Sequence, residues 1–255
     1  MSAELSQKTG TPSEMGSGRA ARNPRQLLLM AVAVTLVLNY IPYADILLYP
    51  LRLFVTFIHE SGHALAAIAS GGSVEAMRVF SNGEGVTGIR VAPWWAWFSL
   101  SGGYLGTTVF GACLLLFTRV WRKGNTGRAA LYLTAGWVLL ATILWVSNPI
   151  TNMFTLVVGL LLTAILMALG RFLSPRVADF VAAFLAVECC LNALTDLRIL
   201  LYLTTNTNRD NDAVFMSHAY GGPPAMWAVL WAGMALGILG VAFWSYWRAA
   251  EKHEP

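Results

Sequence analysis

A series of apolar runs, most of them near the length of a membrane-crossing helix, constrains this sequence more than any other feature. The runs cover residues 27–40 and roughly 50–70, 98–119, 128–147, 150–170, 177–203 and 225–247. A helix of about 20 apolar residues crosses the hydrocarbon core of a bilayer and satisfies its own backbone hydrogen bonds there. Charged residues make up only 12% of the chain, against about 25% in soluble domains. The sequence therefore predicts an all-α polytopic membrane protein.

The predicted number of transmembrane helices is about six or seven. The turn Ser147-Asn148-Pro149 is so tight that one of the two runs beside it could be re-entrant. Residues 1–26 are polar and are expected to form a flexible tail, followed by a single transmembrane domain over 27–248 and a short charged tail over 249–255. Lys and Arg occur in connections on both sides, so the sidedness stays open. The expected location is a multi-pass integral membrane protein, in the plasma membrane if the source is bacterial.

Charge and cysteine content exclude two other classes of protein. The net charge is +4, and much of the basic excess lies beside apolar runs, which favours lipid headgroups over nucleic acid as a partner. Cys113, Cys189 and Cys190 all lie inside apolar runs. Neither a disulfide framework nor a zinc knuckle fits that placement.

Two connections are longer than turns. The first, residues 72–92, contains two β-prone runs around a Gly-rich segment, Ser81-Asn82-Gly83-Glu84-Gly85, and predicts a short β-hairpin between the second and third helices. The second, Thr204–Pro224, is rich in Asn and Asp and ends in Gly-Gly-Pro-Pro. This composition predicts a polar, solvent-facing loop.

The second apolar run carries the motif His59-Glu60-Ser61-Gly62-His63. Residues four apart share one face of an α-helix, so His59 and His63 are placed to bind one Zn²⁺ ion together. Glu60 projects about 100° around the helix from His59, where it can serve as a general base. Ionisable groups at membrane depth each cost a few kcal/mol, which favours a function for this cluster. A satisfied polar cluster that only holds helices together is the alternative.

A catalytic zinc site has three protein ligands and one open position. Within the apolar runs the best candidate for the third ligand is Asp196, because Glu188, Asn192 and Asp196 recur every four residues and form one polar stripe. An ion pair or snorkelling near the helix end is the alternative for Asp196. Asn192 could donate a hydrogen bond to the oxyanion of a tetrahedral intermediate, or it could form a structural hydrogen bond between helices. Glu188 could be a hydrogen-bond partner of a metal ligand or a helix-packing contact. Asp212 and His218 in the polar loop are rival ligands of lower rank.

Three segments resemble a known family. They are Phe57–Gly72 with its HExxH motif, the Gly-rich stretch Ser101–Gly106 followed by Gly111, and Asn211-Asp212-Ala213 with a later Pro-Pro-x-x-Trp. Over roughly residues 50–250 the chain resembles the site-2 protease class of intramembrane zinc metalloproteases, peptidase family M50, and its M50B-like branch most of all.

The resemblance implies one Zn²⁺ per chain, with His59 and His63 as ligands and Glu60 as the catalytic acid/base. It also implies that Asp196 is the third ligand, standing where the family has an Asp on a later core helix. The family's Asp lies in an Asn-Pro…Leu-Asp-Gly setting, whereas Leu194-Thr195-Asp196-Leu197 has no neighbouring Pro or Gly.

The leading hypothesis is a zinc-dependent intramembrane endopeptidase that hydrolyses a peptide bond in or near a transmembrane segment of a membrane-protein substrate. An extended substrate could pair with the hairpin by strand addition, with contacts at Val86, Thr87 and Gly88; an ordinary surface hairpin is the alternative. The second hypothesis is a non-proteolytic scaffold or transporter-like protein with a structural metal or polar cluster. The expected partners are the substrate and the bilayer, without nucleic acid, and the oligomeric state stays open.

Overall fold

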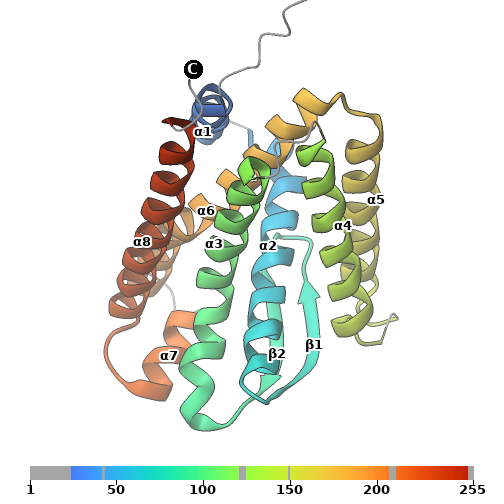
Figure 1. The fold of residues 1–255 in the computed structure, drawn as a ribbon. Coiled ribbons are helices and arrows are strands. Elements are labelled where there is room, and N and C mark those ends of the chain that lie inside the picture. Colours follow the sequence, from blue (N-terminus) through green and yellow to red (C-terminus); the bar gives the residue numbers. More distant parts are fainter. Residues whose placement is uncertain (1–23, 42–43, 121–124, 149, 207–210, 252–255) are drawn as a thin grey trace, which may run out of the picture.

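The structure of the chain is a computed structural model, which describes all residues except 1–23, 42–43, 121–124, 149, 207–210 and 252–255. Some helical side chains, including those of residues 192–206, also lie outside this description. The described residues are mostly helical (Figure 1). The elements in chain order are α1 Pro24–Tyr40, α2 Ala44–Ala69, β1 Ser73–Val79, β2 Gly85–Arg90, the 3₁₀ turn η1 Pro93–Trp95, α3 Ala96–Val120, α4 Thr126–Trp145, α5 Met153–Phe172, α6 Pro175–Asn206, α7 Asp212–Tyr220 and α8 Pro224–Glu251.

Four of the described helices are long and apolar enough to cross a membrane: α3, α4, α5 and α8. All seven predicted runs fall on helices, but the count of six or seven spans is not confirmed. The reasons are local. Helix α1 has 17 residues, short of the roughly 20 that a span requires, and α2 carries ionisable residues along its length. In α6 the side chains of residues 192–206 lie outside the described residues, so that helix is not tested as a span. The runs on either side of the tight turn are both complete helices.

The predicted hairpin is confirmed. Strands β1 and β2 pair antiparallel, from Ser73 opposite Arg90 to Val79 opposite Gly85, with a bulge at Glu75. In the connecting turn Gly83 has a φ of +84°, which an L side chain rarely adopts. The hairpin lies alongside α2 and runs back from the end of that helix toward its N-terminal half (Figure 1).

Hydroxyl groups of α2 hold the hairpin turn in this position. Tyr49 donates to the carbonyl of Ser81 at 2.8 Å, and Thr56 donates to the carbonyl of Gly83 at 2.9 Å. Since these two residues are seven apart, they lie on the same face of α2. The hairpin is therefore fixed along one face of the helix that carries the HExxH motif.

Helices α2 and α3 approach so closely that their backbones touch. A Cβ on Gly62 would lie 2.3 Å from the carbonyl oxygen of Gly102, and a Cβ on Gly102 would lie 2.8 Å from that of Gly62. Small residues permit this approach in membrane helices. The Gly-rich stretch of α3 therefore packs directly against the motif helix, and this packing brings α3 against the histidines.

The segment 204–224 differs from the predicted loop. Helix α6 continues to Asn206, and α7 follows at Asp212. Ala213 and Met216 on α7 are buried in a cluster with Tyr104 of α3 and Trp231 of α8. The sequence did not predict this helix because its short apolar run, which packs against α3 and α8, is flanked by polar residues typical of a loop.

Candidate metal centre

The two motif histidines converge as their helical spacing predicts. The Nε2 atoms of His59 and His63 are 3.1 Å apart, and both belong to α2. His63 Nδ1 lies 2.8 Å from the carbonyl oxygen of Ser99. A carbonyl oxygen only accepts, so Nδ1 of His63 donates the proton and its Nε2 keeps the lone pair for a metal.

Helix α7 brings a carboxylate to this pair. Asp212 Oδ2 lies 3.3 Å from Nε2 of His59 and 3.3 Å from Nε2 of His63. The local sequence explains the position of Asp212, because Asn211 caps the helix by accepting from the backbone N–H of Val214 at 3.1 Å. Burial of Ala213 and Met216 then fixes α7 between α3 and α8.

The three ligand atoms fit a tetrahedral metal ion. Zinc binds imidazole nitrogen and carboxylate oxygen at about 2.0–2.2 Å, so tetrahedral ligand atoms lie about 3.3 Å apart. The observed separations of 3.1, 3.3 and 3.3 Å match that value. His59, His63 and Asp212 are the one such group of three among the described residues.

Gly103 closes one side of the site. A Cβ at this position would lie 2.3 Å from Nε2 of His59 and 2.3 Å from Nε2 of His63. A side chain would therefore fill the space against both ligand nitrogens. The adjacent Tyr104 ring meets His59 edge to face, with centroids 4.7 Å apart, and stacks on Trp231.

The charge of the site suits a bound metal ion, and its partial exposure leaves that position accessible to water and other molecules. Burial by itself raises the pKa of Asp212, but positive charge on the neighbouring imidazoles, that of His63 above all, outweighs it and holds this pKa well below its usual range; in the metal-bound site the cation takes the place of that charge. Asp212 is therefore ionised, as a metal ligand must be. The side chains of His59 and Asp212 remain 12% and 22% exposed, which leaves an approach to the ligand atoms.

Glu60 of α2 is buried against the hairpin. Thr87 on β2 donates to Glu60 Oε2 at 2.7 Å, and its hydroxyl also lies 3.1 Å from the backbone carbonyl of Glu60. On the other side, a Cβ on Gly85 would lie 2.5 Å from Glu60 Oε1. The carboxylate is thus enclosed by β2.

The other predicted site residues have different positions. The side chains of Asn192 and Asp196 lie outside the described residues, so their roles stay predictions. Among the described residues, the carboxylate that lies beside both histidines is that of Asp212, the rival ligand of lower rank. Glu188 accepts a 2.6 Å hydrogen bond from Thr35 of α1, the interhelical contact that was one of its two alternatives. His218 is exposed on the last turn of α7.

Signals for Asp212, which was ranked below Asp196, and for Gly103, which was not singled out as part of the site, were present but incomplete. Asn211 followed by Asp212 is a helix N-cap pattern, and it indicates an ordered α7 rather than a loop. The Gly-rich stretch Ser101–Gly106 indicates close packing, but contact of Gly103 with both histidines depends on the rotation of α3 about its axis. No local pattern supplies that rotation.

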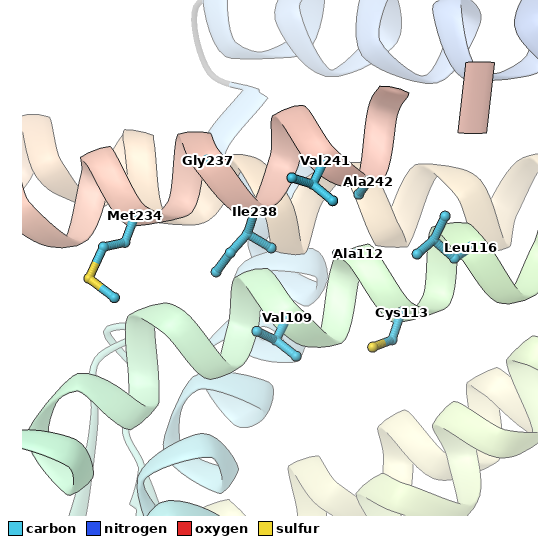
Figure 2. Close-up of a pocket in the computed structure, with 9 residues that line it drawn as sticks. All are labelled: Val109, Ala112, Cys113, Leu116, Met234, Gly237, Ile238, Val241 and Ala242. Carbon is cyan, nitrogen blue, oxygen red and sulfur yellow. The ribbon is translucent and has the colours of Figure 1, made fainter. Parts of the chain in front are cut away.

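An apolar groove of about 500 Å³ lies between α3 and α8, away from these ligands (Figure 2). Its lining consists of Val109, Ala112, Cys113, Leu116, Met234, Gly237, Ile238, Val241 and Ala242. Cys113 is exposed there, whereas Cys189 and Cys190 are buried. The lining includes none of His59, His63 and Asp212, the group among the described residues that could hold a metal ion.

These features define a class: a helical membrane protein whose HExxH helix, late carboxylate and covering hairpin form a metallopeptidase-type centre. The chain belongs to the Peptidase M50B-like family, whose family model matches residues 27–242. No curated protein and no solved structure matches the chain. Family membership supports a peptidase, and together with the four apolar helices it indicates an integral membrane protein.

Proposed function

We propose that the chain is a zinc-dependent intramembrane endopeptidase, which hydrolyses a peptide bond in or near a transmembrane segment of a membrane-protein substrate. The observation that carries the proposal is the triangle of His59, His63 and Asp212 ligand atoms beside the buried Glu60 carboxylate. Family membership supports the same class of reaction. One Zn²⁺ per chain is proposed, with Asp212 rather than Asp196 as the third ligand.

The residues of the chain divide the chemistry between them. His59, His63 and Asp212 would hold the zinc ion, which would supply a Lewis acid for the scissile carbonyl and for a water molecule. Glu60 removes a proton from the attacking water as its oxygen bonds to the carbonyl carbon, and then delivers the proton to the amine as the C–N bond breaks. Ser99 keeps His63 in the tautomer that presents Nε2.

The hairpin supports a role in substrate binding. A transmembrane helix hides its amides in its own hydrogen bonds, so the substrate must be extended before it can be cut. Strand addition supplies new partners for those amides. On β1, Thr155 of α5 hydrogen-bonds to both the N–H and the carbonyl of Val79. Because α5 thus occupies backbone groups of β1, the proposed docking edge for the substrate is that of β2, with Val86, Thr87 and Gly88.

The proposal is tested first by metal analysis of the detergent-purified protein. About one zinc per chain is expected in wild type, retained in Glu60→Gln and lost in His63→Ala. Zinc lost in Asp212→Ala but retained in Asp196→Ala supports Asp212 as the ligand, and the reverse result supports Asp196. Wild type that lacks zinc after purification without chelator would favour the non-proteolytic scaffold or transporter.

The reaction itself is tested in reconstituted membranes with single-span test proteins. Wild type is expected to produce fragments whose new termini, identified by mass spectrometry, lie in or next to the span. Glu60→Gln is the matched control, since it keeps the side-chain shape and removes the base. Equal cleavage by both proteins would refute the proposed role of Glu60.

A further inference from the structure

The hydroxyls between α2 and the hairpin have two different targets. Thr56 of α2 donates to a backbone carbonyl in the hairpin turn, at Gly83. Thr87 of β2 donates in the opposite direction, to the side-chain carboxylate of Glu60. The first bond can only hold the hairpin in place, whereas the second also fixes the group that the proposed reaction uses.

The geometry around Thr87 indicates that the carboxylate is its main partner. The Thr87 hydroxyl has one proton to donate, and it lies 2.7 Å from Glu60 Oε2 but 3.1 Å from the Glu60 carbonyl. The carbonyl of Glu60 lies within α2 and already accepts a helical hydrogen bond. A hydroxyl bond to an ionised oxygen is shorter and about twice as strong as one between neutral groups.

The backbone of the hairpin holds Thr87 firmly. Thr87 pairs with Met77 on β1, and the Met77 side chain is fully buried. The Gly85 backbone lies against the other side of Glu60, where an added Cβ would be 2.5 Å from Oε1 and 2.6 Å from Cγ. The carboxylate therefore has little freedom to turn while β2 stays in place.

We infer that Thr87 is a positioning residue, which orients the Glu60 carboxylate and so couples the strand that receives the substrate to the catalytic base. The inference rests on the proposed function. It assigns a second role to the hairpin, because a substrate strand added to β2 steadies the same element that holds Glu60. A carboxylate has about four acceptor positions, so the bond from Thr87 leaves Glu60 free to accept from water.

The test uses metal and inhibitor binding, so it requires no known substrate. A small hydroxamate, acetohydroxamic acid, chelates zinc and also hydrogen-bonds to a catalytic carboxylate, so its affinity reports the position of Glu60. Zinc-loaded wild type, Thr87→Val, Thr87→Ser and Thr56→Val are compared by isothermal titration calorimetry. Zinc content is measured on the same samples.

Thr87→Val is expected to keep its zinc and to bind the hydroxamate about tenfold more weakly or worse, since a hydrogen bond to a charged group is lost. Thr87→Ser restores the hydroxyl and is expected to bind like wild type. Thr56→Val removes a hydroxyl of the same interface that donates to the Gly83 carbonyl and not to the Glu60 carboxylate, so it is also expected to bind like wild type. Gly85→Ala, which crowds Oε1, is expected to keep zinc and to weaken binding.

Two outcomes overturn the inference alone: wild-type hydroxamate affinity in Thr87→Val with full zinc, or equal losses in Thr87→Val and Thr56→Val. The second outcome would show that both threonines only attach the hairpin. Absence of zinc from wild type overturns the proposed function, and the inference with it. These results are distinguishable because zinc content and hydroxamate affinity are measured separately.

Discussion

Gly103→Ala is the substitution from which the structure predicts most about the metal centre. Gly103 lies on α3 and ligates nothing itself, but its missing side chain leaves the space next to both ligand nitrogens. An added Cβ would lie 2.3 Å from each Nε2, whereas ordinary van der Waals contact begins at about 3.4 Å. Each imidazole would have to retreat by about 1 Å.

That displacement is large for a metal site. Functional zinc sites keep their ligand distances within about 0.2 Å of ideal, so a shift of about 1 Å exceeds the tolerance roughly fivefold. The histidines cannot retreat freely, because Ser99 holds Nδ1 of His63 and Tyr104 packs against His59. Gly103→Ala is therefore expected to lose zinc, although all three ligands are still present.

Two control variants separate this effect from general overpacking, which costs about 1–3 kcal/mol wherever it occurs. A Cβ on Gly159 would lie 2.2 Å from Thr142 Oγ1, at the contact of α4 with α5, and a Cβ on Gly136 would meet no atom within 4 Å. Gly159→Ala is expected to lower Tm and keep zinc. Gly136→Ala is expected to change neither.

The assay is zinc per chain by atomic emission, with Tm followed on the same detergent-solubilised samples. Gly103→Ala is expected to fall well below the about one zinc per chain of wild type. Wild-type zinc content in Gly103→Ala would refute the reasoning, because the methyl group would then have found room beside both nitrogens. Loss of zinc in Gly159→Ala as well would attribute the effect to unspecific loosening.

Three further predictions concern α7 and the metal. Asp212→Ala should weaken zinc binding by more than about a hundredfold, because loss of mere supporting partners already costs ten- to a hundredfold; unchanged affinity in a competition titration would exclude Asp212. Tyr220→Phe removes a hydroxyl at the end of α7 that donates to the Pro93 carbonyl at 2.7 Å and accepts from the Trp97 N–H at 3.0 Å. Because this hydroxyl anchors the helix that carries Asp212, zinc affinity should fall about tenfold in Tyr220→Phe. Wild-type affinity in this variant would contradict the anchoring role. Chelation should lower the Tm of wild type, since metal at 1,000 times its Kd contributes about 4 kcal/mol, but should leave the Tm of Asp212→Ala unchanged; an equal fall in both would contradict the assignment.

The arrangement of His59, Glu60 and His63 was predictable because it is local. The geometry of one helix turn fixes which of these residues share a face, and no other part of the chain is needed. The hairpin is also local, since Gly83 and its neighbours determine the turn between two β-prone runs. The sequence was therefore sufficient for the arrangement of these three residues and for the hairpin.

Counting membrane spans was harder, because hydropathy cannot distinguish a polar side chain that faces lipid from one that faces a site. Helix α2 carries His59, Glu60 and His63 toward the protein interior, and these residues lower its apolarity without exposing charge to a bilayer. The apolar runs alone predicted the helices, but not which of them cross the membrane.

The sequence by itself determined the motif on α2 and the hairpin that follows, and only the tertiary structure brought Asp212, Gly103 and Thr87 to that motif. Asp212 is separated from His59 by 153 residues along the chain, yet its oxygen lies 3.3 Å from the imidazole nitrogen. That contact depends on the packing of α7 against α3 and α8. Hydropathy alone placed Asp212 in a polar loop and so ranked it below Asp196 as a candidate ligand. Contacts between distant segments depend on the rotation and depth of whole helices, which no short sequence pattern encodes.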